Sequence, residues 1–256
     1  LCFDTENSND TTHPDTNKVI NYYIDYFNRK NLSFIKKKVI NIEKEHKIFK
    51  IYFEDNTEIF SKYVILATGI FENINLLNID TNYSFINYSF SDLSTKNKNL
   101  VLIGGGNSSI DYIINLLPYN KITWIVRNTY TKNSAHLGLL NNTINRYRNN
   151  LTLYENTYVK QFNQNRSLIL SNNIRLNNID YCNILIGYNY KSNFCDKINI
   201  DYTNDGTIKL DEHYQTSLEN LFIFGSLASQ IKSMVYIDKG NPDKLKKIIN
   251  YILSKD

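Results

Sequence analysis

Apolar and polar residues alternate with several periods along the chain, and these periods predict an α/β fold. A helical period begins near Pro14 and continues to Phe27, which predicts a first helix. Residues 34–62 alternate in short bursts, which predicts an antiparallel meander of three or four strands. The run Tyr63–Ala67 is apolar throughout, so we expect a strand buried on both faces, as parallel strands are.

A second pattern follows residues 70–97, which are polar and aperiodic and which we expect to form a connector. Strand and helix periods then alternate in the order β-α-β-α-β. This order is typical of a nucleotide-binding unit with a parallel sheet. The expected strands are 99–103, 121–126 and 151–154, and the expected helices are 108–117 and 137–147.

Two apolar strands that end at a glycine bracket this unit. One ends at Thr68-Gly69, and the other ends at Gly225-Ser226 within TSLENLFIFGS. Because they lie on both sides of the nucleotide-binding unit, we expect one domain to be interrupted by another. The expected parts are residues 1–88, an inserted domain at 89–192, and a part at 193–256 that closes with a helix over 243–253.

The turn between the first strand and helix of the inserted unit is GGGNSS, a variant of the GxGxxG dinucleotide fingerprint. In this fingerprint the first glycine allows a tight turn, the second lets the backbone approach a pyrophosphate, and a small third residue lets helix and strand pack closely. A plain turn that needs glycine only for its geometry is the alternative. The candidate nucleotide-binding residues are Gly104, Gly106, Asn107, Ser108 and Ser109.

The end of the next strand favours NADPH over NADH. In this fold an acidic residue there binds the ribose hydroxyls of NAD, whereas an arginine accommodates the 2′-phosphate of NADP. The segment KITWIVRNTYTK offers Arg127 and Lys132 and no carboxylate. We therefore expect NADPH, and the alternative that Arg127 is an ordinary surface residue stays open.

Composition excludes several other classes of protein. The chain is 42% hydrophobic and 21% charged, with a net charge of +4 and no apolar run near the roughly 20 residues that cross a bilayer. The lack of such a run leads us to expect no membrane partner, and the scattered lysines lead us to expect no nucleic-acid partner. Three distant cysteines without a CxxC favour a reducing cytosol, so we expect a cytoplasmic protein. The four histidines lie far apart in the sequence, so we expect no metal site, and we assign no catalytic residue.

Four segments together resemble a known superfamily. VILATG, VLIGGGNSS, ITWIVR and TSLENLFIFGS occur in the order found in the two-dinucleotide-fold flavoproteins related to thioredoxin reductase and the flavin monooxygenases. The resemblance implies an α/β protein with two Rossmann-like domains, in which an NADPH domain is inserted in an FAD domain. Within the superfamily the chain is most similar to the bacillithiol-disulfide reductase-like group, through ATGIFENINLLNID and VYIDKG. The implied FAD-binding residues are Val39, Ala67, Thr68, Gly69, Gly225, Ser226 and Ile237.

Motifs of neighbouring groups are missing. Thioredoxin reductases resemble this chain but carry a CxxC before the inner glycines, and residues 84–99 contain no cysteine. Flavin monooxygenases carry an FxGxxxH signature in the same place, which residues 84–99 also lack. The resemblance further implies a glycine fingerprint ahead of Cys2 that the sequence does not hold, so we expect a fragment with an incomplete FAD domain.

The resemblance implies an NADPH-dependent FAD oxidoreductase. Hydride would pass from NADPH to the flavin and then to a low-molecular-weight disulfide or another electron acceptor. The alternatives are a flavin monooxygenase, a ferredoxin or flavodoxin NADP reductase, and a non-catalytic NADPH-binding module. Relatives in the superfamily are commonly dimers, so a homodimer is also among the expectations.

Overall fold

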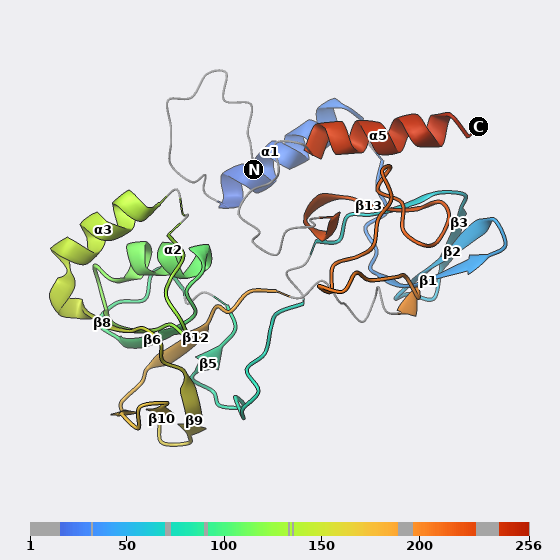
Figure 1. Cartoon of the computed structure of the whole chain (residues 1–256). Helices are drawn as coiled ribbons and strands as arrows, with labels where there is room; N and C mark the ends of the chain where they lie inside the picture. The colour runs from blue at the N-terminus through green and yellow to red at the C-terminus, as the bar shows by residue number, and fades with distance from the viewer. Residues whose placement is uncertain are drawn as a thin grey trace. The chain divides into compact units, whose positions relative to one another are not determined.

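The computed structural model describes residues 16–31, 33–69, 73–89, 92–132, 134, 136–188, 197–228 and 241–255. Contacts divide the chain into two compact units. The first unit comprises residues 1–69 and 190–256, and the second comprises residues 70–189. The second unit is therefore inserted in the sequence of the first. This arrangement, together with a parallel sheet in the inserted unit, confirms the predicted α/β class (Figure 1).

The first unit contains two small sheets. The predicted meander is present as an antiparallel sheet in the order β1-β2-β3, and β4 pairs in parallel with β13. The bounds are α1 (Thr16–Arg29), β1 (Val39–Glu45), β2 (Ile48–Phe53), β3 (Glu58–Ser61), β4 (Val64–Leu66), β13 (Leu221–Ile223), η2 (Gly225–Ala228) and α5 (Asn241–Leu253).

The prediction that the strand at Tyr63–Ala67 is buried on both faces is wrong. Val64 and Leu66 are buried, but Ile65 between them is 38% exposed. Successive side chains of a strand point to opposite faces of its sheet. In the described part of the chain β4 pairs with β13 alone, so its apolar composition does not reflect cover on both sides. The predicted first helix is present as α1, and four of its large apolar residues are exposed, namely Ile20, Tyr23, Ile24 and Phe27.

The second unit is built on a five-stranded parallel sheet in the order β5-β12-β6-β7-β8. The predicted strands and helices are confirmed to within one residue, whereas β5, inside the expected connector, was missed. The bounds are β5 (Ile86–Asn87), β6 (Asn99–Ile103), α2 (Asn107–Leu116), β7 (Lys121–Ile125), α3 (Leu137–Arg146), η1 (Arg148–Asn150), β8 (Leu151–Tyr154), β9 (Val159–Asn163), β10 (Ser167–Leu170), β11 (Arg175–Leu176) and β12 (Tyr181–Ile184).

Each face of the parallel sheet has its own core. Helices α2 and α3 cover one face, and the antiparallel sheet β9-β10-β11 lies on the other side (Figure 1). Alternation along β6 supplies both cores, because Leu100 and Leu102 pack with the helices while Val101 and Ile103 pack with β9 and β10. A strand that is buried on both faces is apolar along its length, as Leu100–Ile103 is, and this pattern predicts the strand from the sequence.

One polar side chain is buried in the centre of this sheet. Asn183 on β12 is fully buried and accepts a hydrogen bond from the Tyr112 hydroxyl on α2 at 2.7 Å. Its Nδ2 donates to the carbonyl of Ser89 at 2.6 Å. Asn183 therefore joins α2 to the segment that follows β5, and both of these hydrogen bonds would be lost if its amide were removed.

We predict that Asn183→Ala lowers the free energy of unfolding by roughly 2–4 kcal/mol, because it removes two hydrogen bonds made by a fully buried amide and leaves a small cavity in the sheet. Urea unfolding followed by fluorescence of Trp124, the single tryptophan, measures this change in the second unit. Exposed Asn177→Ala is the matched control and should change stability by no more than about 0.5 kcal/mol. Equal effects of the two substitutions would contradict the role given to Asn183.

Candidate functional site

The glycine turn lies at the carboxyl end of the parallel sheet, where the strand order reverses. The chain proceeds from β6 to β7 and β8 on one side, whereas β12 pairs with β6 on the other. In open α/β sheets, ligands bind in the crevice beyond the carboxyl ends of the strands at such a switch point. The turn after β6 therefore occupies the position in this fold at which a nucleotide is expected.

Gly104 allows β6 and the end of β12 to approach each other closely. Its φ is +131°, and an added Cβ would lie 2.1 Å from the carbonyl oxygen of Leu185. A side chain at this position would therefore collide with backbone that cannot yield. The Gly104 amide donates to Ile125 of β7 at 3.0 Å, so the turn is fixed to the strands on both sides of β6.

Gly106 leaves open space at the start of α2. It is the N-cap residue, with φ of −87° and no side-chain cap, and an added Cβ would meet nothing within 4 Å. The first turn of α2 carries no acidic residue. Because the first N–H groups of a helix lack partners within the helix and carry partial positive charge, this end can bind an anion.

Two polar atoms at this turn have no hydrogen-bond partner. Ser109 is fully buried and its Oγ is unpaired, 3.2 Å from the Cβ position of Gly104. The Oδ1 of Asn107 is also buried and unpaired. A ribose hydroxyl or an amide can satisfy an acceptor such as the Asn107 oxygen, so the turn fits a dinucleotide in both shape and polarity.

The basic residues expected at the adenosine end lie on a loop that touches the turn. Arg127 and Lys132 are both exposed, and the backbone between them is held by Thr131, whose amide donates to the carbonyl of Gly105 at 2.8 Å. The structure also brings a carboxylate to this loop that the sequence did not indicate. Glu155, which follows β8, accepts a hydrogen bond from the Thr129 hydroxyl at 2.6 Å.

In the first unit, the two glycine-terminated strands meet at one edge. Leu66 lies opposite Ile223 in the parallel register. Gly69 and Gly225 have φ of +71° and +74°, and Ser226 Oγ lies 3.5 Å from the Cβ position of Gly69. Positive φ values at both strand ends need glycine and turn the backbone sharply at a carboxyl edge, which is where a ligand binds in such sheets.

The remaining residues expected at the FAD site lie in different places. Ala67 and Thr68 are exposed between β4 and Gly69. Val39 begins β1, which belongs to the meander and not to the sheet of β4 and β13. Ile237 lies outside the described residues.

Cysteine chemistry has no support in the described residues. Cys182 is fully buried on β12, and burial raises the pKa of its thiol well above the ordinary value, so it is not a nucleophile. Cys2 and Cys195 lie outside the described residues.

The described residues hold no cluster of His, Cys, Asp or Glu side chains able to hold a metal ion. Among the described helices, none is long and apolar enough to span a bilayer.

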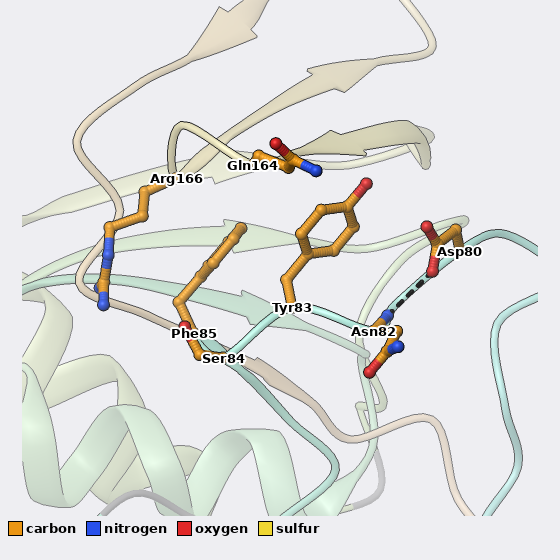
Figure 2. Close-up of a pocket in the computed structure, with 7 residues that line it drawn as sticks. All are labelled: Asp80, Asn82, Tyr83, Ser84, Phe85, Gln164 and Arg166. Carbon is orange, nitrogen blue, oxygen red and sulfur yellow. Dashed lines mark hydrogen bonds between the residues drawn. The ribbon is translucent and has the colours of Figure 1, made fainter.

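A separate hollow of about 450 Å³ lies between the segment before β5 and the turn that joins β9 to β10 (Figure 2). Figure 2 shows the rings of Tyr83 and Phe85 side by side between Arg166 and Asp80. Its two charged side chains already bond within the chain, because Asp80 accepts from the Asn82 amide and Arg166 donates to the Asp180 carbonyl. Phe85 immediately precedes β5, so this hollow is at the amino end of the sheet and not at the switch point.

Sequence reasoning missed two aromatic residues beside the turn. Trp124 on β7 donates its indole N–H to the carbonyl of Gly104 at 2.6 Å, and its ring packs against Tyr130. The apolar run of β7 shows only that Trp124 is buried. The hydrogen bond depends on the spatial neighbourhood of β6 and β7, which the sequence does not reveal.

Fold and turn together define a dinucleotide-binding α/β protein, and comparisons with known proteins give its family. The sequence matches the pyridine nucleotide-disulphide oxidoreductase family over residues 3–225. The chain belongs to this family of oxidoreductases, which confirms the superfamily predicted from the four sequence segments.

Two curated relatives are ferredoxin–NADP reductases. The protein from Mycoplasmoides gallisepticum is 33% identical over 196 residues, covering 71% of this chain and 57% of that protein. The protein from Acholeplasma laidlawii is 26% identical over 203 residues, covering 75% and 61%. The chain thus spans about three-fifths of the length of these curated relatives.

A similar solved structure is the bacillithiol disulfide reductase Bdr (YpdA) from Bacillus cereus. It matches with a TM-score of 0.83 and 21% identity, covering 98% of this chain and 82% of that chain. At this identity the match establishes the shared fold.

We predict that Gly104→Ala destabilises the second unit by at least about 4 kcal/mol, because the new Cβ collides with the Leu185 carbonyl. Gly106→Ala, whose Cβ enters open space, should cost no more than about 1 kcal/mol. Urea unfolding of both variants tests this contrast. A well-folded Gly104→Ala variant would contradict the close approach of β6 and β12.

We also predict that Cys182 is unreactive in the folded protein. In a Cys2→Ser/Cys195→Ser variant, Cys182 should react with a thiol reagent such as 5,5′-dithiobis(2-nitrobenzoate) only after denaturant is added, because burial keeps it protonated and inaccessible. The same variant in urea is the positive control. Prompt reaction under native conditions would contradict the burial of Cys182.

Proposed function

We propose that the protein is an NADPH-dependent flavoprotein oxidoreductase that uses FAD. The observation that carries this proposal is the glycine turn at the switch point of the parallel sheet. A nicotinamide dinucleotide with a 2′-phosphate suits this site in two ways. Its pyrophosphate suits the open space at Gly106 and the start of α2, which has no side-chain cap, and its 2′-phosphate suits the basic loop after β7. Membership of an oxidoreductase family supports an enzymatic function.

The chain's own residues would act by binding and orientation. The N–H groups at the start of α2 would hold the pyrophosphate, and the glycines would let it approach the backbone. Arg127 and Lys132 would neutralise the 2′-phosphate, while Asn107 and Ser108 would border the cradle. The buried Ser109 would set the distance between α2 and β6.

The first unit would hold FAD at its glycine-terminated edge. The sharp turns at Gly69 and Gly225 and the hydroxyl of Ser226 fit a bound dinucleotide in geometry and donor chemistry. FAD would supply the chemistry of accepting a hydride and passing electrons onward. Val39, Ala67, Thr68 and Ile237 remain predicted contacts of this cofactor.

For the electron acceptor we propose a low-molecular-weight disulfide. Similarity in fold to a bacillithiol disulfide reductase supports this choice. Residues 84–99 carry no cysteine and Cys182 is buried, so those parts of the chain offer no dithiol to relay electrons to a protein substrate. A homodimer remains a prediction.

A second candidate is a ferredoxin–NADP reductase. It is favoured by the 33% identity to a protein of that name. The two candidates differ in the acceptor, because a disulfide takes two electrons whereas a ferredoxin takes one at a time. NADPH oxidation by the flavin-loaded protein, measured with bacillithiol disulfide and separately with a ferredoxin, distinguishes them.

We predict that the chain binds NADPH about 10-fold or more tightly than NADH, since charge-assisted contacts to the 2′-phosphate add to the shared contacts. Gly106→Ala should weaken binding of both nucleotides by about 10-fold or more, because its Cβ enters the space proposed for the pyrophosphate. Isothermal titration calorimetry measures both affinities.

Gly138→Ala is the matched control, since an added Cβ there also meets nothing within 4 Å but lies on α3. It should leave nucleotide affinity unchanged. Equal loss in the two variants, or equal affinity for NADPH and NADH in the unaltered chain, would refute this assignment.

A further inference from the structure

A line of contacts joins the glycine turn to one of the two basic residues. Trp124 is fully buried and donates its indole N–H to the Gly104 carbonyl at 2.6 Å. Its ring lies 4.8 Å, centroid to centroid, from the ring of Tyr130. The ammonium nitrogen of Lys132 lies 3.4 Å from the centroid of that second ring. The carbonyl of the turn is thereby linked to a cation through two aromatic side chains.

The backbone of the loop is fixed at the same place. The Thr131 amide donates to the Gly105 carbonyl at 2.8 Å, and the Cβ position of Gly105 lies 3.1 Å from the Cα of Tyr130. The loop therefore packs directly on the turn, and the Tyr130 ring lies between the buried Trp124 and the exposed Lys132. A displaced Tyr130 would leave the Lys132 side chain without its support.

The two basic side chains differ in how well they are held. Lys132 rests on an aromatic face, which attracts a cation and restricts the long side chain. Arg127 is exposed, and among the described residues its guanidinium has no hydrogen bond, ion pair or ring contact. Ordering a free long side chain on binding costs conformational entropy, so a restrained cation gives the larger net gain.

An acidic group makes this restraint important. Glu155 reaches the loop through the Thr129 hydroxyl, and its negative charge opposes a phosphate bound nearby. A second contact of a carboxylate lies near the turn, because Nδ1 of His136, at the start of α3, is 2.7 Å from Asp111 Oδ1 on α2. A preference for a 2′-phosphate at this site therefore requires a cation whose position is fixed.

We propose that the Trp124–Tyr130 pair is a positioning device that couples the glycine turn to Lys132, and that Lys132, more than Arg127, determines selectivity for a 2′-phosphate. This inference rests on the proposed function, because it concerns the same dinucleotide site. Tyr130 and Trp124 are positioning residues, and Lys132 is the group that contacts the phosphate.

Two adenosine fragments test the inference on the full chain. Adenosine 2′,5′-bisphosphate carries the 2′-phosphate, and adenosine 5′-monophosphate lacks it. The selectivity is the ratio of their affinities, measured by calorimetry. Lys132→Gln should lower this ratio by about 10-fold, as expected for a charge-assisted contact, whereas Arg127→Gln should lower it by less than about 3-fold.

Tyr130 variants test the positioning role. Tyr130→Leu should lower the ratio of affinities nearly as much as Lys132→Gln, although it removes no charge. Tyr130→Phe should keep the ratio of the unaltered chain, because the aromatic ring is retained. The Tyr130→Leu/Lys132→Gln double variant should be no less selective than Lys132→Gln alone, since the two residues act as one unit. If a substitution only damaged the local structure, it would weaken the binding of both fragments equally and leave the ratio of their affinities unchanged.

The outcomes separate the two proposals. If the unaltered chain binds neither fragment, or binds both equally, the proposed NADPH site itself fails. If it prefers the bisphosphate but Arg127→Gln removes the preference, or Lys132→Gln or Tyr130→Leu leaves it intact, the site stands and the inference is overturned. Because Lys132 is exposed, Lys132→Gln is expected to fold and gives a result even if Tyr130→Leu does not fold.

Discussion

The close approach of Gly104 to the Leu185 carbonyl is the constraint on which the inserted unit depends. This contact brings the end of β12 against the turn after β6, where the order of the parallel strands reverses. Only a residue without a Cβ fits there. The Ile125 carbonyl and the Trp124 indole also bond to this turn, so its backbone is contacted on three sides.

A rigid turn of this kind explains how the site could recognise a dinucleotide with few side chains. The partial positive charge at the start of α2 suits the pyrophosphate, and Gly106 leaves room for it. In the proposed site, discrimination between the two nicotinamide nucleotides would fall to the loop after β7, where Lys132 and Glu155 carry opposite charges. In this proposal binding and selectivity would depend on neighbouring but separate groups, which are joined through Trp124 and Tyr130.

The sequence predicted most of the inserted unit because local signals agree with the tertiary fold. Strands buried on both faces are apolar throughout, and the GGGNSS turn marks the change from strand to helix. Sequence patterns did not predict features that depend on contacts between distant parts of the chain. Ile65 looks buried from its apolar surroundings but is exposed, β5 is too short to show a period, and Glu155 reaches the loop only through the packing of β8 beside β7.

Amide hydrogen exchange with and without NADPH tests the central claim most directly, because it locates the bound nucleotide on the backbone. The account predicts slower exchange in a peptide that covers residues 104–110, together with the loop at 127–132, and unchanged exchange around Asp80–Phe85. Protection confined to the hollow near Asp80, or binding without protection at the glycine turn, would contradict it.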